Sequence, residues 1–180
     1  MERPIMRALL KWRDRSYRKP LLLLGARQVG KTYILKEFGR QHYEHTAYIN
    51  CEDNEMVKNL FEPDYNIQRI LLAIGSITGV SILPGKTLII LDEIQELKRG
   101  LNALKYFCEN APEYHVAVAG SLLGITLHQG ESFPVGKVNT LKIFPMSYEE
   151  FLLAKGQRQM YDMLVQKQWD VMASTRSKYI

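Results

Sequence analysis

Eight consecutive residues near the N-terminus match every specified position of G-x-x-x-x-G-K-[ST], a pattern that cradles phosphates. They are Gly25, Ala26, Arg27, Gln28, Val29, Gly30, Lys31 and Thr32. The two glycines let successive backbone N–H groups converge on phosphate oxygens, and the lysine adds a positive charge. The threonine hydroxyl suits Mg²⁺, and a helix that begins near Gly30 would point its positive end at the same anion. The segment therefore predicts binding of a nucleoside triphosphate, rather than an ordinary glycine-rich turn with an exposed lysine.

Two acidic residues further along the chain could complete such a site. Asp92 and Glu93 directly follow the apolar run 87–91, and ligands of open α/β sheets bind at the carboxyl ends of the strands. We expect Asp92 to hold Mg²⁺, directly or through water, and Glu93 to orient and activate the attacking water. An Asp-Glu pair after a strand often does no more than end that strand in solvent. The upstream phosphate loop makes the functional interpretation the favoured one.

Ser121 is the third candidate for chemistry. It follows the apolar segment 115–119, so its hydroxyl could hydrogen-bond the γ-phosphate and report its presence. A small turn residue in that position is an almost equally good interpretation.

The elements that must position these residues alternate between strand and helix patterns. Strands are expected over 21–24, 46–50, 87–91, 115–119 and 138–143, the last of them at the outside. Helices are expected over 32–38, 53–61, 65–74 and 159–171, with a helical face over 101–108, a loop over 130–134 and a frayed tail over 174–178. Ser147 and Glu150 form a capping-box pattern, so a helix should begin there. The alternation predicts an α/β fold with a five-stranded, mostly parallel sheet.

The positive charge is concentrated at the N-terminus. Residues 1–20 hold seven basic and two acidic side chains, a net charge of +5 that equals that of the whole chain. Ile5, Leu9 and Trp12 have the i, i+4, i+7 spacing of an amphipathic helix, whose basic face we interpret as solvated. Trp12 and Tyr17 among basic residues leave a nucleic-acid surface as the alternative. The predicted organisation is a basic helix over 1–19, a P-loop core over 20–155 and a C-terminal helix and tail over 156–180.

Composition narrows the class of protein. A chain of 180 residues with 46% hydrophobic and 24% charged residues fits one globular domain with a sizeable core. The longest uncharged stretch, 70–85, is shorter than the ~20 residues of a membrane-spanning helix, and no export signal is recognisable. The two cysteines lack metal or redox spacing and fit inert thiols in a reducing cytoplasm, and the histidines are interpreted as structural: Cys51, Cys108, His42, His45, His115 and His128.

The motifs in this order resemble the AAA-type P-loop ATPases of bacteria and archaea. The N-terminal module of that family reads GARQVGKT, then a strand ending in DEIQ, then AGS, a PVGR-like segment and a PLSFEEF-like segment. The matching stretches here are residues 25–32, 91–95, 119–121, 134–137 and 144–151. The resemblance implies a P-loop NTPase three-layer sandwich of the additional-strand, catalytic-glutamate type, in which one strand separates the P-loop strand from the Asp-Glu strand.

The resemblance also implies residue roles. It implies ATP as the nucleotide, Asp92 on the magnesium side, Glu93 as catalytic base and Ser121 as sensor. Family members commonly carry a further C-terminal domain like a restriction endonuclease, and this chain ends before such a domain. Lys137 stands where relatives often have arginine, and an ammonium group cannot imitate a planar guanidinium. The candidates for an arginine finger are Arg27, Arg69 and Arg99.

The leading hypothesis is an ATP-binding module that hydrolyses ATP with Mg²⁺ to drive or gate the activity of a partner. The alternative is a binding module in which ATP orders a surface for DNA or protein and hydrolysis is slow or absent. A GTPase is disfavoured because neither D-x-x-G nor N/T-K-x-D occurs. A small-molecule kinase is disfavoured because no arginine-rich lid is recognisable. The sequence predicts no membrane partner and leaves a homo-oligomer open.

Overall fold

The computed structural model describes residues 4–52, 55–58, 60–121 and 134–169. It divides into two compact units, Pro4–Phe144 and a smaller unit that begins at Pro145. Several expectations fall outside the described residues: positions 1–3 of the N-terminal helix, 53, 54 and 59 of the helix at 53–61, most of the loop at 130–134, His128, the last two residues of the helix at 159–171 and the tail.

Five strands form one parallel sheet. They are β1 (Leu21–Gly25), β2 (His45–Asn50), β3 (Thr87–Asp92), β4 (His115–Ser121) and β5 (Asn139–Lys142). Their order is β2-β3-β4-β1-β5, and every pairing is parallel. The five predicted strands are confirmed, and β5 is an outer strand as expected. Because β4 lies between β1 and β3, the topology is that of the additional-strand class of P-loop NTPase folds.

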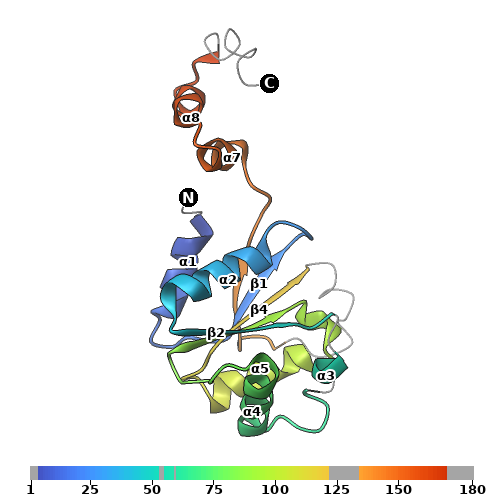
Figure 1. Cartoon of the computed structure of the whole chain (residues 1–180). Coiled ribbons are helices and arrows are strands. Elements are labelled where there is room, and N and C mark those ends of the chain that lie inside the picture. Colours follow the sequence, from blue (N-terminus) through green and yellow to red (C-terminus); the bar gives the residue numbers. More distant parts are fainter. Residues whose placement is uncertain (1–3, 53–54, 59, 122–133, 170–180) are drawn as a thin grey trace. The chain divides into compact units, whose positions relative to one another are not determined.

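The alternation of side chains along the strands feeds two cores. In β1, Leu22 and Leu24 face a core that includes residues of α3 (Glu55–Lys58), α4 (Ile67–Thr78) and α5 (Gly100–Asn110). Leu21 and Leu23 face the opposite core, which includes residues of α1 (Pro4–Arg13) and α2 (Lys31–His42). Burial on both faces is what a continuous apolar strand requires. The helices therefore cover the sheet on both sides and make three layers (Figure 1).

The helix after β2 differs from its prediction. The described helix α3 covers Glu55–Lys58 only, and α4 begins at Ile67 instead of residue 65. The physical reason for the later start is Asn66, whose side chain accepts a hydrogen bond from the Arg69 backbone N–H at 3.1 Å. An asparagine in this N-cap position satisfies a free donor of the first turn and fixes where the helix begins. Gly79, in the left-handed region with φ 66°, ends the same helix.

The N-terminal helix α1 is amphipathic as predicted. Its buried residues are Met6, Leu9 and Trp12, while Ile5 of the predicted face is partly buried. Several of the basic side chains nearby are engaged within the chain: Arg13 pairs with Asp14, Arg18 donates to the Pro112 carbonyl and Lys19 to the Gly136 carbonyl. Arg18 and Lys19 therefore help to hold the N-terminal segment against the rest of the chain.

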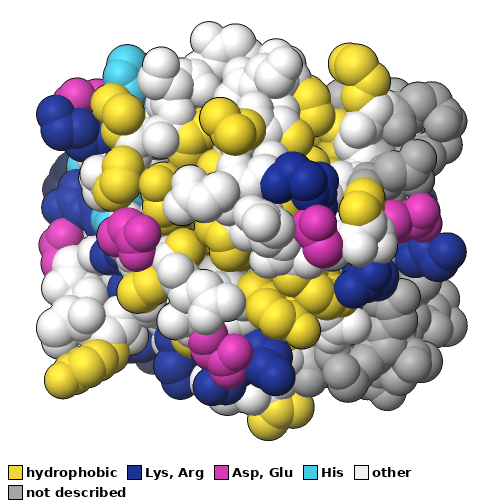
Figure 2. All heavy atoms as spheres, turned by 90° about the horizontal axis from the view of Figure 1, so that it is seen from below, with side chains coloured by type: hydrophobic (Ala, Val, Ile, Leu, Met, Phe, Trp, Pro, Cys, Tyr) yellow, Lys and Arg dark blue, Asp and Glu magenta, His cyan; other side chains and the backbone are white. Residues whose placement is uncertain are grey.

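A hollow of about 600 Å³ opens beside the C-terminal half of α4. It is also lined by Gly79–Leu83 and by Tyr114, which directly precedes β4. The hollow therefore lies at the N-terminal edge of the sheet, where the parallel strands begin, and the phosphate loop follows the other end of β1. The view from below shows hydrophobic side chains exposed among polar ones (Figure 2), and Leu72 on α4 is 76% exposed. Lys, Arg and His are missing from this lining, so the hollow offers no cation for a phosphate.

The smaller unit contains α7 (Tyr148–Ala154) and α8 (Arg158–Val165). The predicted capping box is confirmed. Ser147 Oγ accepts a hydrogen bond from the Glu150 N–H at 3.2 Å, and the Ser147 N–H donates to Glu150 Oε2 at 2.9 Å. Over the part of the chain with described coordinates, none of the helices has the length and apolar character needed to cross a membrane.

Candidate nucleotide-binding site

The predicted phosphate loop connects the C-terminal end of β1 to α2. Ala26, Arg27 and Gln28 are exposed, and two residues have positive φ angles, Gln28 at 64° and Gly30 at 91°. Gly30 is the N-cap of α2, and no side-chain cap is present among the described residues. The first N–H groups of this 12-residue helix therefore face the loop without a side-chain acceptor. Such a helix start attracts anions through both its donors and its dipole.

Gly25 is required by packing. A Cβ placed on this residue would lie 2.6 Å from the Ile143 carbonyl oxygen and 2.7 Å from Ile143 Cγ2. The Ile143 N–H donates to the Leu24 carbonyl at 2.8 Å, which holds the residue after β5 against the end of β1. The structure thus supplies a reason for this glycine other than the predicted approach of backbone to phosphate. That approach stays a prediction.

The lysine of the motif lies beneath the loop. Lys31 is only 5% exposed, and its Nζ donates to the carbonyls of Ala26 at 2.9 Å and Gly25 at 3.3 Å. Both acceptors belong to the loop itself. The ammonium group is therefore held against the predicted phosphate loop, the position from which its charge is expected to attract an anion.

The two halves of the motif meet at Asp92. The Thr32 hydroxyl donates to Asp92 Oδ2 at 2.5 Å, although the residues are 60 positions apart in the chain. The Tyr48 hydroxyl donates to the same oxygen at 3.3 Å, and Lys36 Nζ lies 3.4 Å from the centre of the Tyr48 ring. Burial, with the nearby Asp92 charge, raises the pKa of Tyr48 to about 12. The tyrosine therefore stays a neutral donor toward a carboxylate that is 4% exposed.

Glu93 follows in an unusual conformation. Its φ of 52° and ψ of 49° place it in the left-handed region, directly before the 3-10 turn η1 (Ile94–Glu96). Its N–H donates to Asp92 Oδ1 at 3.2 Å, and its carboxylate accepts a hydrogen bond from Gln95 Nε2 at 2.6 Å. Left-handed backbone is costly for a residue with a Cβ. This unfavourable backbone conformation therefore occurs at Glu93, the residue that the sequence predicts to be the catalytic base.

Ser121 lies next to the loop. It is the last residue of β4 and is paired in register with Gly25 of β1. It is 7% exposed. Asn50 lies in register with Asp92 at the end of β2. Four strands therefore end at the C-terminal edge of the sheet with residues of the candidate site: Gly25 of β1, Asn50 of β2, Asp92 of β3 and Ser121 of β4.

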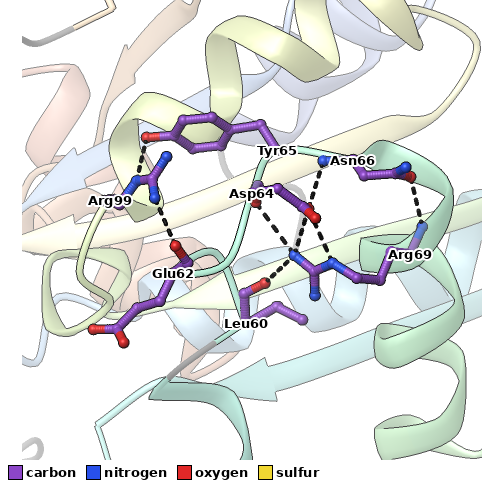
Figure 3. A network of polar contacts seen from close by, with 7 residues as sticks. All are labelled: Leu60, Glu62, Asp64, Tyr65, Asn66, Arg69 and Arg99. Atoms are coloured by element: carbon purple, nitrogen blue, oxygen red, sulfur yellow. Dashed lines mark hydrogen bonds and ion pairs between the residues drawn. The ribbon is translucent and has the colours of Figure 1, made fainter.

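Two of the arginine-finger candidates are anchors of the segment 60–66. Arg69 donates to the Leu60 and Asp64 carbonyls and pairs with the Asp64 carboxylate at 2.9 Å. Arg99 donates to the Glu62 carbonyl and to the Tyr65 hydroxyl (Figure 3). The Arg99 guanidinium also lies 4.3 Å from the centre of the Tyr65 ring. Both guanidinium groups are thus committed to contacts within the chain, whereas Arg27 is exposed on the loop.

Lys137 lies at the N-terminal edge of the sheet, where the strands begin. It precedes β5, whose first residue Asn139 is in register with Leu21, the first residue of β1. Its Nζ pairs with Glu109 Oε1 at 2.8 Å, and this hydrogen bond raises the pKa of Lys137 above its usual value. Lys137 is therefore separated from this chain's own phosphate loop by the length of the strands.

Cys51 and His115 are buried and make structural contacts. Cys51 is buried, and burial together with the charges of Asp92 and Glu93 raises the pKa of its thiol to about 12. Its backbone N–H donates to the Asp92 carbonyl at 3.0 Å. His115 is buried and its Nδ1 lies 2.7 Å from the Tyr43 hydroxyl. Cys51 therefore acts as a buried apolar residue that supports the backbone of Asp92.

The oxygen atoms at the site suit Mg²⁺. This ion prefers hard oxygen donors, and it is usually bound through one or two protein groups together with substrate phosphates and water. Thr32 Oγ1 and Asp92 Oδ2 already converge next to the helix start. Clusters of three or more His, Cys, Asp or Glu side chains suited to a metal are absent from the described residues. The donor set thus fits a metal that arrives with a nucleotide better than one held in an all-protein cage.

Sequence reasoning gave no role to Tyr48 and Gln95. Tyr48 lies two residues before Asn50 and shares its side of β2, so strand alternation gave a signal for it once β2 was placed beside β3. Gln95 is the last residue of the DEIQ stretch. Its signal was present in the motif, but only the structure shows that its side chain contacts Glu93.

The fold and the arrangement at the ends of β1, β3 and β4 define a P-loop NTPase domain. Comparison with known families narrows this class. Residues 17–152 match the AAA domain family, and the chain belongs to this family. A search of curated protein sequences finds no match.

Solved structures with similar folds share little sequence with this chain. PCH-2 of C. elegans is 16% identical, with a TM-score of 0.49 over 78% of this chain and 42% of its own. DnaA of Aquifex aeolicus, bound to AMPPCP, is 13% identical, with a TM-score of 0.45 over 94% of this chain and 59% of its own. The Pif1 helicase of Candida albicans is 11% identical, with a TM-score of 0.42 over 89% and 41%. The chain thus spans about half the length of these proteins.

Proposed function

We propose that this domain binds Mg²⁺-ATP and hydrolyses it in the cytoplasm to drive or gate the activity of a partner. The partner is a protein or acts on DNA together with this domain. The observation that carries the proposal is the contact of Thr32 Oγ1 with Asp92 Oδ2 at 2.5 Å. It joins the phosphate-loop half of the motif to the acidic half. A chance P-loop sequence would not be expected to meet a buried carboxylate at the end of β3, which is separated from β1 by β4.

Each residue has a distinct role in the proposed reaction. The N–H groups of residues 25–32 and the Lys31 ammonium bind the β- and γ-phosphates. Thr32 and Asp92 hold Mg²⁺, which when bound neutralises charge on the phosphate oxygens. Glu93 accepts a proton from the water that attacks the γ-phosphorus, and ADP leaves as the bond to the bridging oxygen breaks. Ser121 donates a hydrogen bond to a γ-phosphate oxygen.

The binding-module alternative draws less support from the contacts. It relies on the basic N-terminal segment, yet Arg13, Arg18 and Lys19 are engaged with groups of the chain itself. Lys11 and Arg15 remain exposed. Salt-sensitive DNA binding that disappears when both are changed to alanine would favour this alternative.

The proposed function is tested by calorimetry and turnover. Purified protein should bind Mg²⁺-ATP more tightly than Mg²⁺-GTP and should release phosphate from ATP. Glu93→Gln should retain ATP binding and lose roughly 100-fold or more in kcat, because a general base contributes about that factor. Glu96→Gln is the matched control, since Glu96 is an exposed carboxylate three residues further along. Equal turnover in wild type and Glu93→Gln would remove Glu93 from the mechanism.

A further inference from the structure

The side chain that orients Glu93 is itself buried. Gln95 is 7% exposed and lies in η1, next to Ile94 at 0% and close to Leu97 at 3%. Its Nε2 donates to Glu93 Oε2 at 2.6 Å. A glutamate side chain rotates about three bonds, so a carboxylate without such a donor samples several orientations. The buried amide restricts the Glu93 carboxylate because its own movement is restricted by packing.

The other end of the amide has no comparable partner. Gln95 Oε1 is buried and makes no hydrogen bond with any described residue of the chain. Leaving a buried acceptor unpaired is unfavourable, and an apolar side chain of similar volume would avoid that cost. Stability alone therefore does not account for a glutamine at this position. Among the described residues, the Gln95 amide makes its hydrogen bond with Glu93.

The backbone around Glu93 is irregular. Glu93 is left-handed, and Arg99, the N-cap of α5, is left-handed as well with φ 63°. Residues 94–99, between β3 and α5, form η1 and the turn that leads into α5. Within this segment, Gln95 is the residue whose side chain donates a hydrogen bond to the Glu93 carboxylate.

We propose that Gln95 is a positioning residue for ATP hydrolysis, whose amide holds the Glu93 carboxylate in the orientation that accepts the proton of the attacking water. This role rests on the proposed function. Gln95 touches neither substrate nor metal in this proposal and acts through Glu93. Its loss should consequently lower kcat and leave nucleotide affinity unchanged.

The test compares Gln95→Met, which keeps the side-chain volume and removes the amide, with wild type. We expect kcat to fall on the order of ten-fold, the cost of an unrestrained side chain, while the Kd for a non-hydrolysable ATP analogue stays within about two-fold. The matched control is Gln41→Met, because Gln41 Nε2 also donates to a carboxylate, that of Glu37 on the exposed face of α2. This control should leave kcat unchanged.

A double variant separates positioning from general damage to the fold. If Gln95 acts through Glu93, Gln95→Met should have no further effect on kcat when Glu93→Gln is already present. A loss of similar size in both backgrounds would overturn the proposal. So would wild-type kcat in Gln95→Met, or a loss that appears as weaker nucleotide binding instead of slower turnover.

A spectroscopic measurement tests the contact without nucleotide. In ¹H–¹⁵N spectra, the side-chain amide resonances absent from Gln95→Met belong to Gln95, and we expect them to shift in Glu93→Met. Resonances that do not respond to Glu93 would overturn the proposal. Wild-type protein that binds Mg²⁺-ATP without turnover would overturn the proposed function and this role together, whereas normal wild-type turnover with an unaffected Gln95→Met would overturn this role alone.

Discussion

The N-terminal edge of the sheet, where its parallel strands begin, differs from the C-terminal edge, where they end, in how completely its polar groups are satisfied. Where the strands begin, polar side chains close on groups of the chain: Trp12 Nε1 donates to the Lys19 carbonyl at 2.8 Å and Tyr43 OH lies 2.7 Å from His115 Nδ1. Where the strands end, Glu93 is left-handed and Gln95 keeps a buried acceptor without a partner among the described residues. Unfavourable local features of this kind gather at functional sites.

This difference teaches which edge serves stability and which serves chemistry. At the first edge, each contact should contribute to the free energy of unfolding. At the second, substitutions should change nucleotide binding or turnover without lowering stability. The following predictions test that division, beginning with the largest expected effect.

Trp12→Ala should reduce the free energy of unfolding by about 3–5 kcal/mol, because removing a large aromatic core side chain leaves a cavity. Trp12 is 2% exposed and packs near Phe38, with ring centres 6.4 Å apart. Urea unfolding measures the change. Tyr17→Ala, at a residue that is 90% exposed, is the control and should stay within about 0.5 kcal/mol of wild type. A mild effect at Trp12 would contradict the assignment of this edge to stability.

Acid should destabilise the same edge through His115. Burial lowers the pKa of His115 to about 4, and the charges of Arg18 and Arg13 act in the same direction. The folded state therefore keeps this histidine neutral, while the unfolded chain takes up a proton below its ordinary pKa near 6.5. The stability that His115 provides is complete above pH 6.5 and should fall by about 3 kcal/mol as pH drops toward 4.

The contribution of His115 is isolated by comparing the pH dependence of urea unfolding in wild type and His115→Gln. The variant should lose most of the slope between pH 6.5 and 4. His45→Gln, at an exposed histidine, should retain it. Identical slopes in wild type and His115→Gln would show that other groups cause the acid effect.

Lys31→Ala should weaken Mg²⁺-ATP binding by about 100-fold, since hydrogen bonds to charged groups contribute about 1.5–3 kcal/mol. The melting temperature should change little, because among the described residues the ammonium group donates to the carbonyls of the loop. Lys86→Ala removes the same charge at the other edge, where Lys86 pairs with Glu44. Calorimetry should show normal affinity for this control. Equal losses in both variants would mean that net charge, and not the loop, determines binding.

Tyr48→Phe should have the smallest effect. It removes the hydroxyl that donates to Asp92 Oδ2. This hydrogen bond is long, at 3.3 Å, so we expect it to contribute about 1 kcal/mol, less than a short hydrogen bond to a charged group. We expect the Mg²⁺ concentration for half-maximal turnover to rise about five-fold, the equivalent of that energy. Tyr33→Phe, at a 70% exposed tyrosine of α2, should match wild type. An unchanged Mg²⁺ requirement in Tyr48→Phe would exclude a role of this hydroxyl in holding Asp92.

Local patterns were sufficient for much of the fold. The central strands β1, β3 and β4 were predictable because each is a largely apolar, buried run. The outer strands β2 and β5 are more polar, and their prediction depended on the alternation of strand and helix patterns. The capping box at Ser147 fixed one helix start. The extent of α3 and the start of α4 were not, because a single side-chain contact of Asn66 decides where that helix begins. The residue types of the candidate site were also predictable, since the P-loop spacing is local. The Tyr48 and Gln95 contacts were not, because they depend on strand order and on a left-handed residue that no spacing rule encodes.

The left-handed backbone at Glu93 has a consequence for protein engineering. Glycine or asparagine adopts that conformation at lower cost than glutamate, so Glu93→Gly or Glu93→Asn should raise the melting temperature while turnover disappears. A laboratory selection that rewards heat resistance alone would thus favour losing the proposed base. Thermostable variants of this domain are best screened for phosphate release at the same time.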